Sequence, residues 1–342
     1  MIQGLLGLAL MLAGAECLVR AAAGVAARFN LRPLMLGLTM VALGSSAPQM
    51  AIALRASAEG AGDVALGSVF GGVIFSVLGT LGLCAVITPL RVSRQVVLND
   101  LPLMFAATAL VYALCLNQRL GRAEGAVLLV GLGGYIWMLL GQSRRHGHSW
   151  AAQGKPRSLL GPAVLAALGL GGTLLGSRWL IGATLDMATD LGLSERIAGL
   201  TAVAICAGLP QMLMSLAAVL RGERDLAVGN VIGSNLFNLL GVLGITALAA
   251  PLSVSPNALY FDLPVMLGVT LLAMPLFYAG YRITRLEGLL LLGLYAAYGL
   301  HLLAFTFGMP LAGRLEHTLL RALPLLGLVV AVQAWRTWRR RH

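Results

Sequence analysis

Long runs of uncharged, mostly apolar residues alternate with short charged segments along all 342 residues of the chain. Because an α-helix rises about 1.5 Å per residue, about 20 such residues cross the roughly 30 Å hydrocarbon core of a bilayer. The runs predict ten membrane-spanning helices, at 2–27, 33–54, 64–90, 101–118, 125–143, 158–177, 197–220, 226–250, 258–281 and 288–313. Another run, at 317–335, predicts an eleventh helix near the C-terminus.

The composition favours a membrane protein and excludes a soluble globular one. Hydrophobic residues make up 58% of the chain and charged residues only 11%, which is too few to cover a surface exposed to water. The sequence therefore predicts an all-α integral membrane fold within a lipid bilayer. The net charge of +11 does not indicate nucleic-acid binding, because neither a polar domain nor a basic helix is present to carry such a site.

The basic residues predict the orientation of the chain. If the N-terminus lies outside and eleven helices span the membrane, 16 of the 24 Lys and Arg residues fall in cytoplasmic loops and 6 in outer loops. Cytoplasmic loops are enriched in Lys and Arg, so we expect 142–157 to be a basic cytoplasmic linker and the location to be a bacterial inner membrane. In the first helix, Glu16 is placed to pair with Arg20, or with Arg178 of the sixth helix.

An internal repeat divides the chain into two halves. Shifting the sequence by 162 residues aligns 37–82 with 199–244 without a gap, and 21 of the 46 positions are identical. Each half, 1–141 and 158–305, then holds five helices, and 306–342 is a C-terminal extension. Because five is odd, the second half enters the membrane from the opposite side, as in secondary transporters built from inverted repeats.

In such transporters the binding site lies where the repeats meet, on helices interrupted by Gly or Pro. Pro48 and Pro210 lie at equivalent positions in the middle of two predicted helices. A proline removes one helical hydrogen bond, so we expect a half-helix to start after each proline and free carbonyl oxygens to face a cation.

The helix predicted at 226–250 carries an unusual number of polar residues, Asn230, Ser234, Asn235 and Asn238. Polar residues in a membrane helix can join helices by hydrogen bonds or line a path for ions. Their position directly after an interrupted helix favours the second interpretation.

At these residues the chain resembles the calcium/cation antiporter superfamily, specifically the bacterial sodium/calcium exchangers. Members carry two repeats, each with a segment G-[TS]-S-x-P-E followed by G-N-x-x-G-S-N-x-x-[ND]. The stretch GNVIGSNLFN at 229–238 matches the second segment in full, and GSSAP at 44–48 matches most of the first. The resemblance implies ten helices in two inverted halves, exchange by alternating access, inorganic cations as substrates and no cofactor.

Both halves depart from the family pattern after the proline, where the family has a glutamate as its principal ion ligand. Gln49 and Gln211 occupy those positions. With fewer charged ligands the affinity for Ca²⁺ should fall, and a neutral site fits a monovalent cation better. The predicted cation-binding residues are Thr39, Ser45, Ser46, Gln49, Ser68, Ser76, Thr201, Gln211, Asn230, Ser234, Asn235 and Asn238.

No other carboxylate is an obvious replacement for the two glutamates. Asp63, Asp100, Asp225 and Asp262 lie at predicted helix ends, where we expect capping or interfacial solvation. The sequence thus predicts a secondary cation antiporter of the sodium/calcium exchanger type. Two alternatives stay open: a monovalent-cation transporter with little Ca²⁺ activity, and a transport-inactive structural or regulatory membrane subunit. An enzyme is not expected, because no nucleophile with a base and no paired acids lie in the helices.

Overall fold

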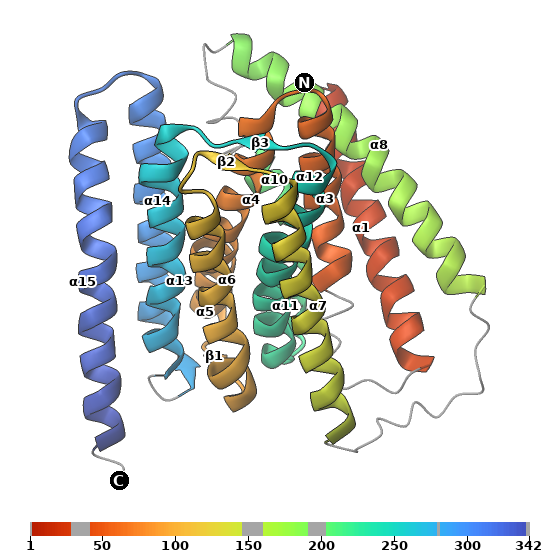
Figure 1. The fold of residues 1–342 in the computed structure, drawn as a ribbon. Helices are drawn as coiled ribbons and strands as arrows, with labels where there is room; N and C mark the ends of the chain where they lie inside the picture. Colours follow the sequence, from red (N-terminus) through yellow and green to blue (C-terminus); the bar gives the residue numbers. More distant parts are fainter. Residues whose placement is uncertain (1, 29–41, 146–159, 191–202, 279–280, 340–342) are drawn as a thin grey trace.

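The computed structural model describes residues 2–28, 42–145, 160–190, 203–278 and 281–339. Within these ranges a helix overlaps every position at which an apolar run predicts one (Figure 1). Seven of the described helical segments are long and apolar enough to cross a membrane. The prediction of a helical membrane protein is confirmed. Thr39, Thr201 and most of the 142–157 linker lie outside the described residues.

The first half contains helices of both α and π type and two short strands. Its elements are α1 (Ile2–Arg28), α3 (Ala42–Ala58), α4 (Gly62–Ile74), the π-helical turn η2 (Phe75–Thr80), α5 (Leu81–Ile87), β1 (Leu90–Arg91), the π-helical turn η3 (Val96–Asp100), α6 (Leu101–Leu114), β2 (Arg119–Leu120) and α7 (Arg122–Arg145).

The second half repeats this order and is followed by one more helix. Its elements are α8 (Leu160–Asp190), α10 (Ala204–Leu220), α11 (Arg224–Leu236), the π-helical turn η5 (Phe237–Val242), α12 (Leu243–Ala249), β3 (Leu252–Ser253), the π-helical turn η6 (Ala258–Asp262), α13 (Leu263–Tyr278), β4 (Arg282–Ile283) and α14 (Arg285–Thr306), with α15 (Leu311–Arg339) after them. Both halves turn before their third helix at an equivalent glycine with positive φ, 79° at Gly60 and 84° at Gly222, a conformation that glycine adopts without steric cost.

The strand pairs show that the two halves are upside down relative to one another. By the repeat, β1 is the counterpart of β3, and β2 that of β4. The structure instead pairs β1 with β4, and β2 with β3, each antiparallel. In Figure 1, β2 and β3 lie together at one end of the bundle and β1 lies at the other. Equivalent strands thus lie at opposite ends, as inverted repeats require.

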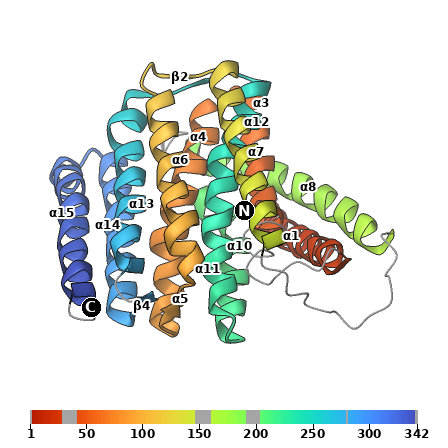
Figure 2. The ribbon, with the colours of Figure 1, turned by 60° about the horizontal axis from the view of Figure 1, so that its bottom comes forward.

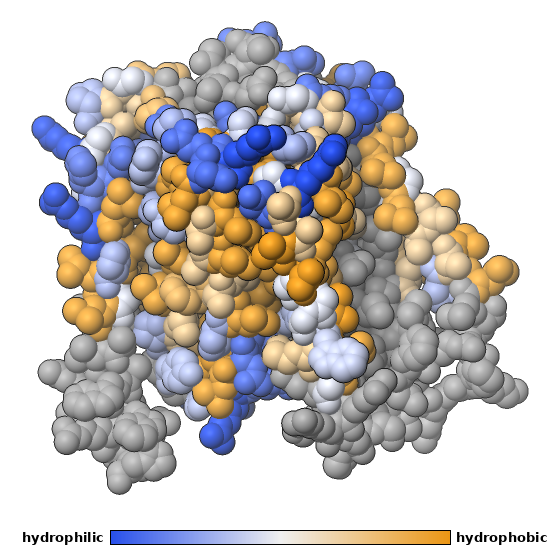
Figure 3. Space-filling view, in the orientation of Figure 1, coloured by the Kyte–Doolittle hydropathy of each residue, from blue (hydrophilic) through white to orange (hydrophobic). Residues whose placement is uncertain are grey.

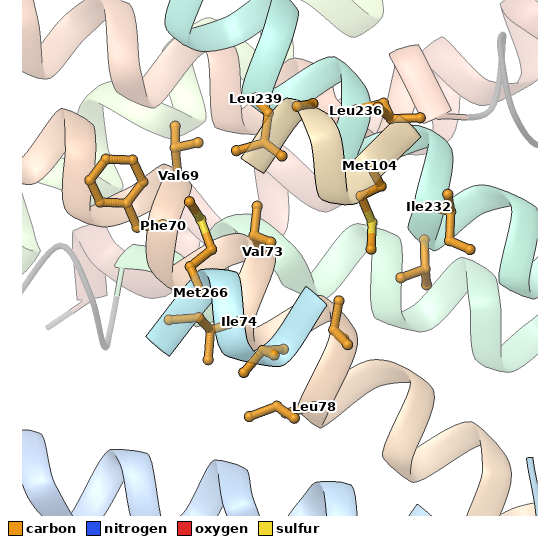
Figure 4. Close-up of a cluster of buried hydrophobic side chains, with 14 of the residues drawn as sticks. Val69, Phe70, Val73, Ile74, Leu78, Met104, Ile232, Leu236, Leu239 and Met266 are labelled. Carbon is orange, nitrogen blue, oxygen red and sulfur yellow. The ribbon is translucent and has the colours of Figure 1, made fainter. Parts of the chain in front are cut away.

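The two central spans, α4–η2–α5 and α11–η5–α12, form the core of the bundle. In their most apolar stretches 83% and 89% of the residues are buried, against 12% in α8. Figure 4 shows the apolar side chains that these spans pack together with Met104 of α6 and Met266 of α13. The outer surface is apolar across the middle and hydrophilic towards its upper and lower edges (Figure 3), as a bilayer requires.

Helices α1 and α8 pack against each other at one side of the bundle (Figure 2). Small residues permit a close approach, because a Cβ atom added to Gly7 would lie 2.8 Å from the Gly176 carbonyl oxygen. Glu16 pairs with Arg20 at 2.7 Å, the first of the two partners that the sequence allows. Helix α8 continues to Asp190, past the end predicted at residue 177. The single exposed arginine at that point, Arg178, does not end the helix.

Helix α15 covers the opposite side of the bundle, where it packs on α13 and α14. A Cβ atom added to Gly268 of α13 would lie 3.1 Å from the Leu323 side chain, so the two helices are in close contact. The ring of His301 on α14 lies 3.1 Å from the Ala312 carbonyl oxygen at the start of α15. The helix predicted in the C-terminal extension is therefore present and starts earlier than residue 317.

Candidate cation-binding site

Two helices from different halves place predicted polar side chains against each other. The hydroxyl oxygens of Ser45 on α3 and Ser234 on α11 lie 2.7 Å apart, and Ser45 Oγ lies 3.1 Å from Asn230 Oδ1. Ser46 donates to the backbone carbonyl of Ser234 at 3.4 Å. None of these four side chains is more than 5% exposed, so the halves meet through hydrogen bonds deep inside the bundle.

The prolines do not divide their helices, which corrects the expected half-helices. Pro48 lies inside α3 and Pro210 inside α10, and Ser45 and Ser46 lie on helical turns before Pro48. A membrane helix tolerates proline where hydroxyl groups and neighbouring helices satisfy the freed backbone groups. In the turn before Pro48, Ser45 Oγ lies 3.1 Å from the Ala42 carbonyl oxygen and Ser234 Oγ lies 3.4 Å from the same atom, so hydroxyl groups of both halves meet at one backbone oxygen.

The polar residues of α11 and η5 face more than one direction. Asn230 and Ser234 face α3, whereas Asn235 Oδ1 accepts a 2.6 Å hydrogen bond from Ser76 Oγ on η2. Asn235 Nδ2 also lies 3.6 Å from the sulfur of Met104 on α6. Asn238 is buried, and its Oδ1 has no hydrogen-bond partner among the described residues. It is an acceptor oxygen available to a ligand.

Gln49 and Gln211, which are equivalent in the repeat, are held differently. Gln49 Nε2 donates to the backbone carbonyl of Ser68, and its amide packs on Gly72, where an added Cβ would lie 2.9 Å from Nε2. The side-chain nitrogen of Gln211 has no hydrogen-bond partner in the described part of the chain. The Gln211 backbone carbonyl instead accepts from Asn230 Nδ2 at 3.4 Å.

The second proline segment lies against an aromatic ring. A Cβ atom added to Gly208 would lie 2.6 Å from Phe75 Cδ1, so the ring occupies the space that a side chain there would need. The equivalent position in the first half is Ser46, which bonds across the interface between the halves. The polar cluster is therefore asymmetric: α3 and α11 supply most of it, and α10 contributes Gln211.

Sequence reasoning missed one member of the cluster and assigned another imprecisely. Ser215, on α10 one turn after Gln211, is buried and lies 3.0 Å from Asn230 Nδ2. Its spacing of four from Gln211 is the signal that could have identified it. The hydroxyl of Ser68 bonds the Ala65 carbonyl of its own helix at 2.8 Å, so Ser68 contributes its backbone oxygen to the cluster.

Asp100 and Asp262 are fully buried, which corrects their expected place at solvated helix ends. Each is the last residue of a π-helical turn, η3 or η6, and their helices begin earlier, the first at Arg94. The apolar runs stop at these residues because they are charged, although the helices continue. Asp63 and Asp225 do lie in the first turns of α4 and α11, where a carboxylate interacts favourably with the helix dipole.

The chemistry of the cluster suits a hard cation bound without charged ligands. Its donors are hydroxyl, amide and carbonyl oxygens, the ligand types that alkali and alkaline-earth ions prefer. Within the described residues no three His, Cys, Asp or Glu side chains come together as a transition-metal site would require.

Comparisons with known proteins agree with this geometry. The profile of the family described as sodium/calcium exchanger protein matches residues 1–141 and 161–304. The protein CaxA of Alkalimonas amylolytica is 35% identical over 307 residues, which cover 86% of this chain and 95% of CaxA. The inner membrane protein YrbG of Escherichia coli is 34% identical, with 78% and 85% covered. A solved structure of the sodium-calcium exchanger NCX_Mj superposes with a TM-score of 0.66 at 27% identity, covering 86% of this chain and 95% of NCX_Mj.

Proposed function

Since the chain belongs to the sodium/calcium exchanger family, we propose that it is a secondary antiporter that exchanges cations across a bacterial inner membrane by alternating access. In this proposal the transported ion binds at the polar cluster formed by α3, α10, α11 and η5. The ion is the substrate of the protein and no further cofactor takes part.

The contact between Ser45 and Ser234 carries the proposal. These two hydroxyl groups belong to opposite halves, lie 2.7 Å apart and are buried in the centre of the bundle. Inverted-repeat transporters bind their substrates where the halves meet, because movement there can open the site to either side of the membrane in turn. An ion that replaces the direct hydrogen bond would be held by both halves together.

The lack of charge in the cluster favours a monovalent cation as a second candidate substrate. Gln49 and Gln211 are amides, and no carboxylate appears among the described hydrogen-bond partners of the cluster. A Ca²⁺ ion held only by neutral oxygens would keep both of its charges in a buried site, which is costly. Na⁺, K⁺ or Li⁺ would bring only one uncompensated charge into the site.

The orientation that we propose has the N-terminus outside and the C-terminal end of α15 inside. Support comes from the arginines at the end of the bundle where β1 and β4 pair, because Arg91 and Arg282 lie directly opposite each other in that ladder. Arg221 precedes α11 and Arg224 is its first residue, and both lie in a segment that the sequence predicts to be cytoplasmic. Such an excess of arginine is typical of cytoplasmic ends.

Flux measurements in proteoliposomes test the function. We expect the wild-type chain to take up radiolabelled Ca²⁺ against a Na⁺ gradient, or to exchange Na⁺, K⁺ or Li⁺ without Ca²⁺. Ser45→Ala and Ser234→Ala should each reduce that flux at least tenfold. Thr246→Val is the matched control, because Thr246 is fully buried and its hydroxyl donates to the Val242 carbonyl one turn earlier in the same span, at 2.7 Å. It should retain wild-type flux.

Three outcomes separate the possible functions. Ca²⁺ uptake by the wild type supports sodium/calcium exchange, and flux restricted to monovalent ions supports the second candidate. If no cation moves in the wild type but Ca²⁺ moves in a Gln49→Glu, Gln211→Glu double variant, the natural chain is a transport-inactive membrane subunit. If Ser45→Ala transports as well as Thr246→Val, the polar cluster is not the binding site.

A further inference from the structure

Asp100 is a buried carboxylate that the cluster described above does not include. Its side chain is fully enclosed at the end of η3, and neither carboxylate oxygen has a hydrogen-bond partner among the described residues. The ion pairs found in the described residues join Glu16 with Arg20 and Arg55 with Glu59, so no arginine there neutralises Asp100. An isolated ionised carboxylate in a membrane interior is strongly unfavourable, so this group either keeps its proton or is balanced by a bound cation.

A second unsatisfied oxygen lies near this carboxylate. Tyr135, in the middle of α7, is 2% exposed, and its hydroxyl also has no hydrogen-bond partner among the described residues. Helix α6, which begins directly after Asp100, and helix α7 both pack against η5, so the two groups lie in the same buried part of the bundle. The Tyr135 ring packs edge-on against Phe237 of η5, with ring centroids 6.4 Å apart. The region therefore adjoins the span that carries Asn230, Ser234 and Asn238.

Met104 connects Asp100 to the polar cluster. It lies one helical turn after Asp100 on α6, and its sulfur accepts from Asn235 Nδ2 at 3.6 Å. Figure 4 shows Met104 among the apolar side chains of the core, including Ile232 and Leu236 of α11. The carboxylate is thus separated from Asn235 by one side chain and about one turn of helix, in surroundings that do not screen its charge.

We propose that Asp100, together with the Tyr135 hydroxyl, binds one monovalent alkali cation, with Na⁺ as the probe, between α6 and α7. A single carboxylate matches a single positive charge, whereas a divalent ion would leave one charge uncompensated in the membrane interior. Carboxylate and phenol oxygens are hard ligands of the kind that alkali ions bind. This ion would supply the charged site that Gln49 and Gln211 no longer provide.

The repeat offers a matched comparison. Asp262, the counterpart of Asp100 after a shift of 162, is equally buried at the end of η6. Both carboxylate oxygens of Asp100 lack a hydrogen-bond partner among the described residues, whereas neither oxygen of Asp262 is a buried atom of that kind. Burial of a carboxylate alone would make the two residues behave alike, whereas a cation site at Asp100 would distinguish them.

Thermal unfolding of the full-length protein in detergent tests the site without any need for transport. The midpoint is measured against NaCl concentration, with choline chloride added to keep the ionic strength constant. We expect a saturable, Na⁺-specific increase in the wild type. Asp100→Asn should raise the half-saturating Na⁺ concentration at least tenfold. In choline chloride alone it should unfold at a higher temperature than the wild type, because a buried acid without a partner in the described part of the chain is removed. Tyr135→Phe should raise the half-saturating concentration about threefold.

Asp262→Asn is the control and should keep the wild-type Na⁺ response. The proposal is wrong if Asp100→Asn binds Na⁺ like the wild type, if Asp262→Asn causes the same loss, or if the wild type shows no Na⁺-specific increase. If Asp100→Asn does not fold, Tyr135→Phe still decides the question, because its hydroxyl has no partner to lose. This inference rests on the proposed function only where it assigns the bound ion to the exchange reaction. A chain that binds Na⁺ through Asp100 but transports no ions would contradict the proposed function and leave the Asp100 site intact.

Discussion

Replacing Gln49 by glutamate should destabilise the protein considerably in the absence of Ca²⁺. Gln49 Nε2 donates to the Ser68 carbonyl, and the side chain is only 2% exposed. An ionised carboxylate would set a negative oxygen against that carbonyl, so the introduced group must be protonated to restore the hydrogen bond. Protonating a glutamate with an ordinary pKa of about 4.3 at pH 7 costs about 3.7 kcal/mol, since each pH unit corresponds to about 1.36 kcal/mol.

Insertion scales give a similar magnitude, about 2.5–3.5 kcal/mol, for a charged side chain at the centre of a membrane helix. A loss of this size should lower the unfolding midpoint of the detergent-solubilised protein by roughly 5 °C. Saturating CaCl₂ should reverse at least half of the decrease, because a bound cation removes the need for a proton. The assay is thermal unfolding at pH 7 with and without CaCl₂.

Gln211→Glu is the matched control for this measurement. Gln211 is almost as buried, but its side-chain nitrogen has no hydrogen-bond partner among the described residues, so no acceptor is left facing the new carboxylate. Its decrease in midpoint should be less than half that of Gln49→Glu. Equal decreases in the two variants, or none in Gln49→Glu, would show that the hydrogen bond to Ser68 does not set the charge preference of this site.

Two further substitutions test the interface between the halves. Ser45→Ala removes the 2.7 Å contact with Ser234, so we expect a loss of stability of about 1–2 kcal/mol in thermal unfolding, and an equal loss in Ser45→Thr would indicate a steric cause instead. Gly208→Ala places a Cβ atom 2.6 Å from the Phe75 ring and should cost about 1–3 kcal/mol by overpacking, whereas Gly134→Ala, with no atom within 4 Å of the added carbon, should be neutral or slightly stabilising.

The repeat predicts which residues are equivalent but not how equivalent residues are used. Gln49 and Gln211 are identical in sequence, and sequence reasoning assigns them the same role. Their contacts differ because their neighbours differ. Ser68 and Gly72 in the first half correspond to Asn230 and Ser234 in the second. Glycine at position 72 leaves room for the Gln49 amide, whereas the asparagine at 230 bonds to the Gln211 backbone.

Asp100 shows a second limit of reading helices from apolar runs. Most of the predicted helices end at a charged residue, so the method places a charge such as Asp100 at a helix end. Whether the charge is solvated depends on how neighbouring helices pack around it, and that information lies in residues distant in sequence. The pairing of Ser45 with the polar residues of α11 could be predicted, because the repeat and the polar pattern both place those helices at the interface between the halves.

The two strand ladders limit how this protein can change shape. One antiparallel pair ties the halves together at one end of the bundle, and the other ties them at the opposite end. Tilting one half against the other would widen the gap at one end and break the main-chain hydrogen bonds there, so the ladders resist such a tilt. Helices α1 and α8 carry none of the paired strands and pack mainly against each other, so the ladders do not restrain them directly.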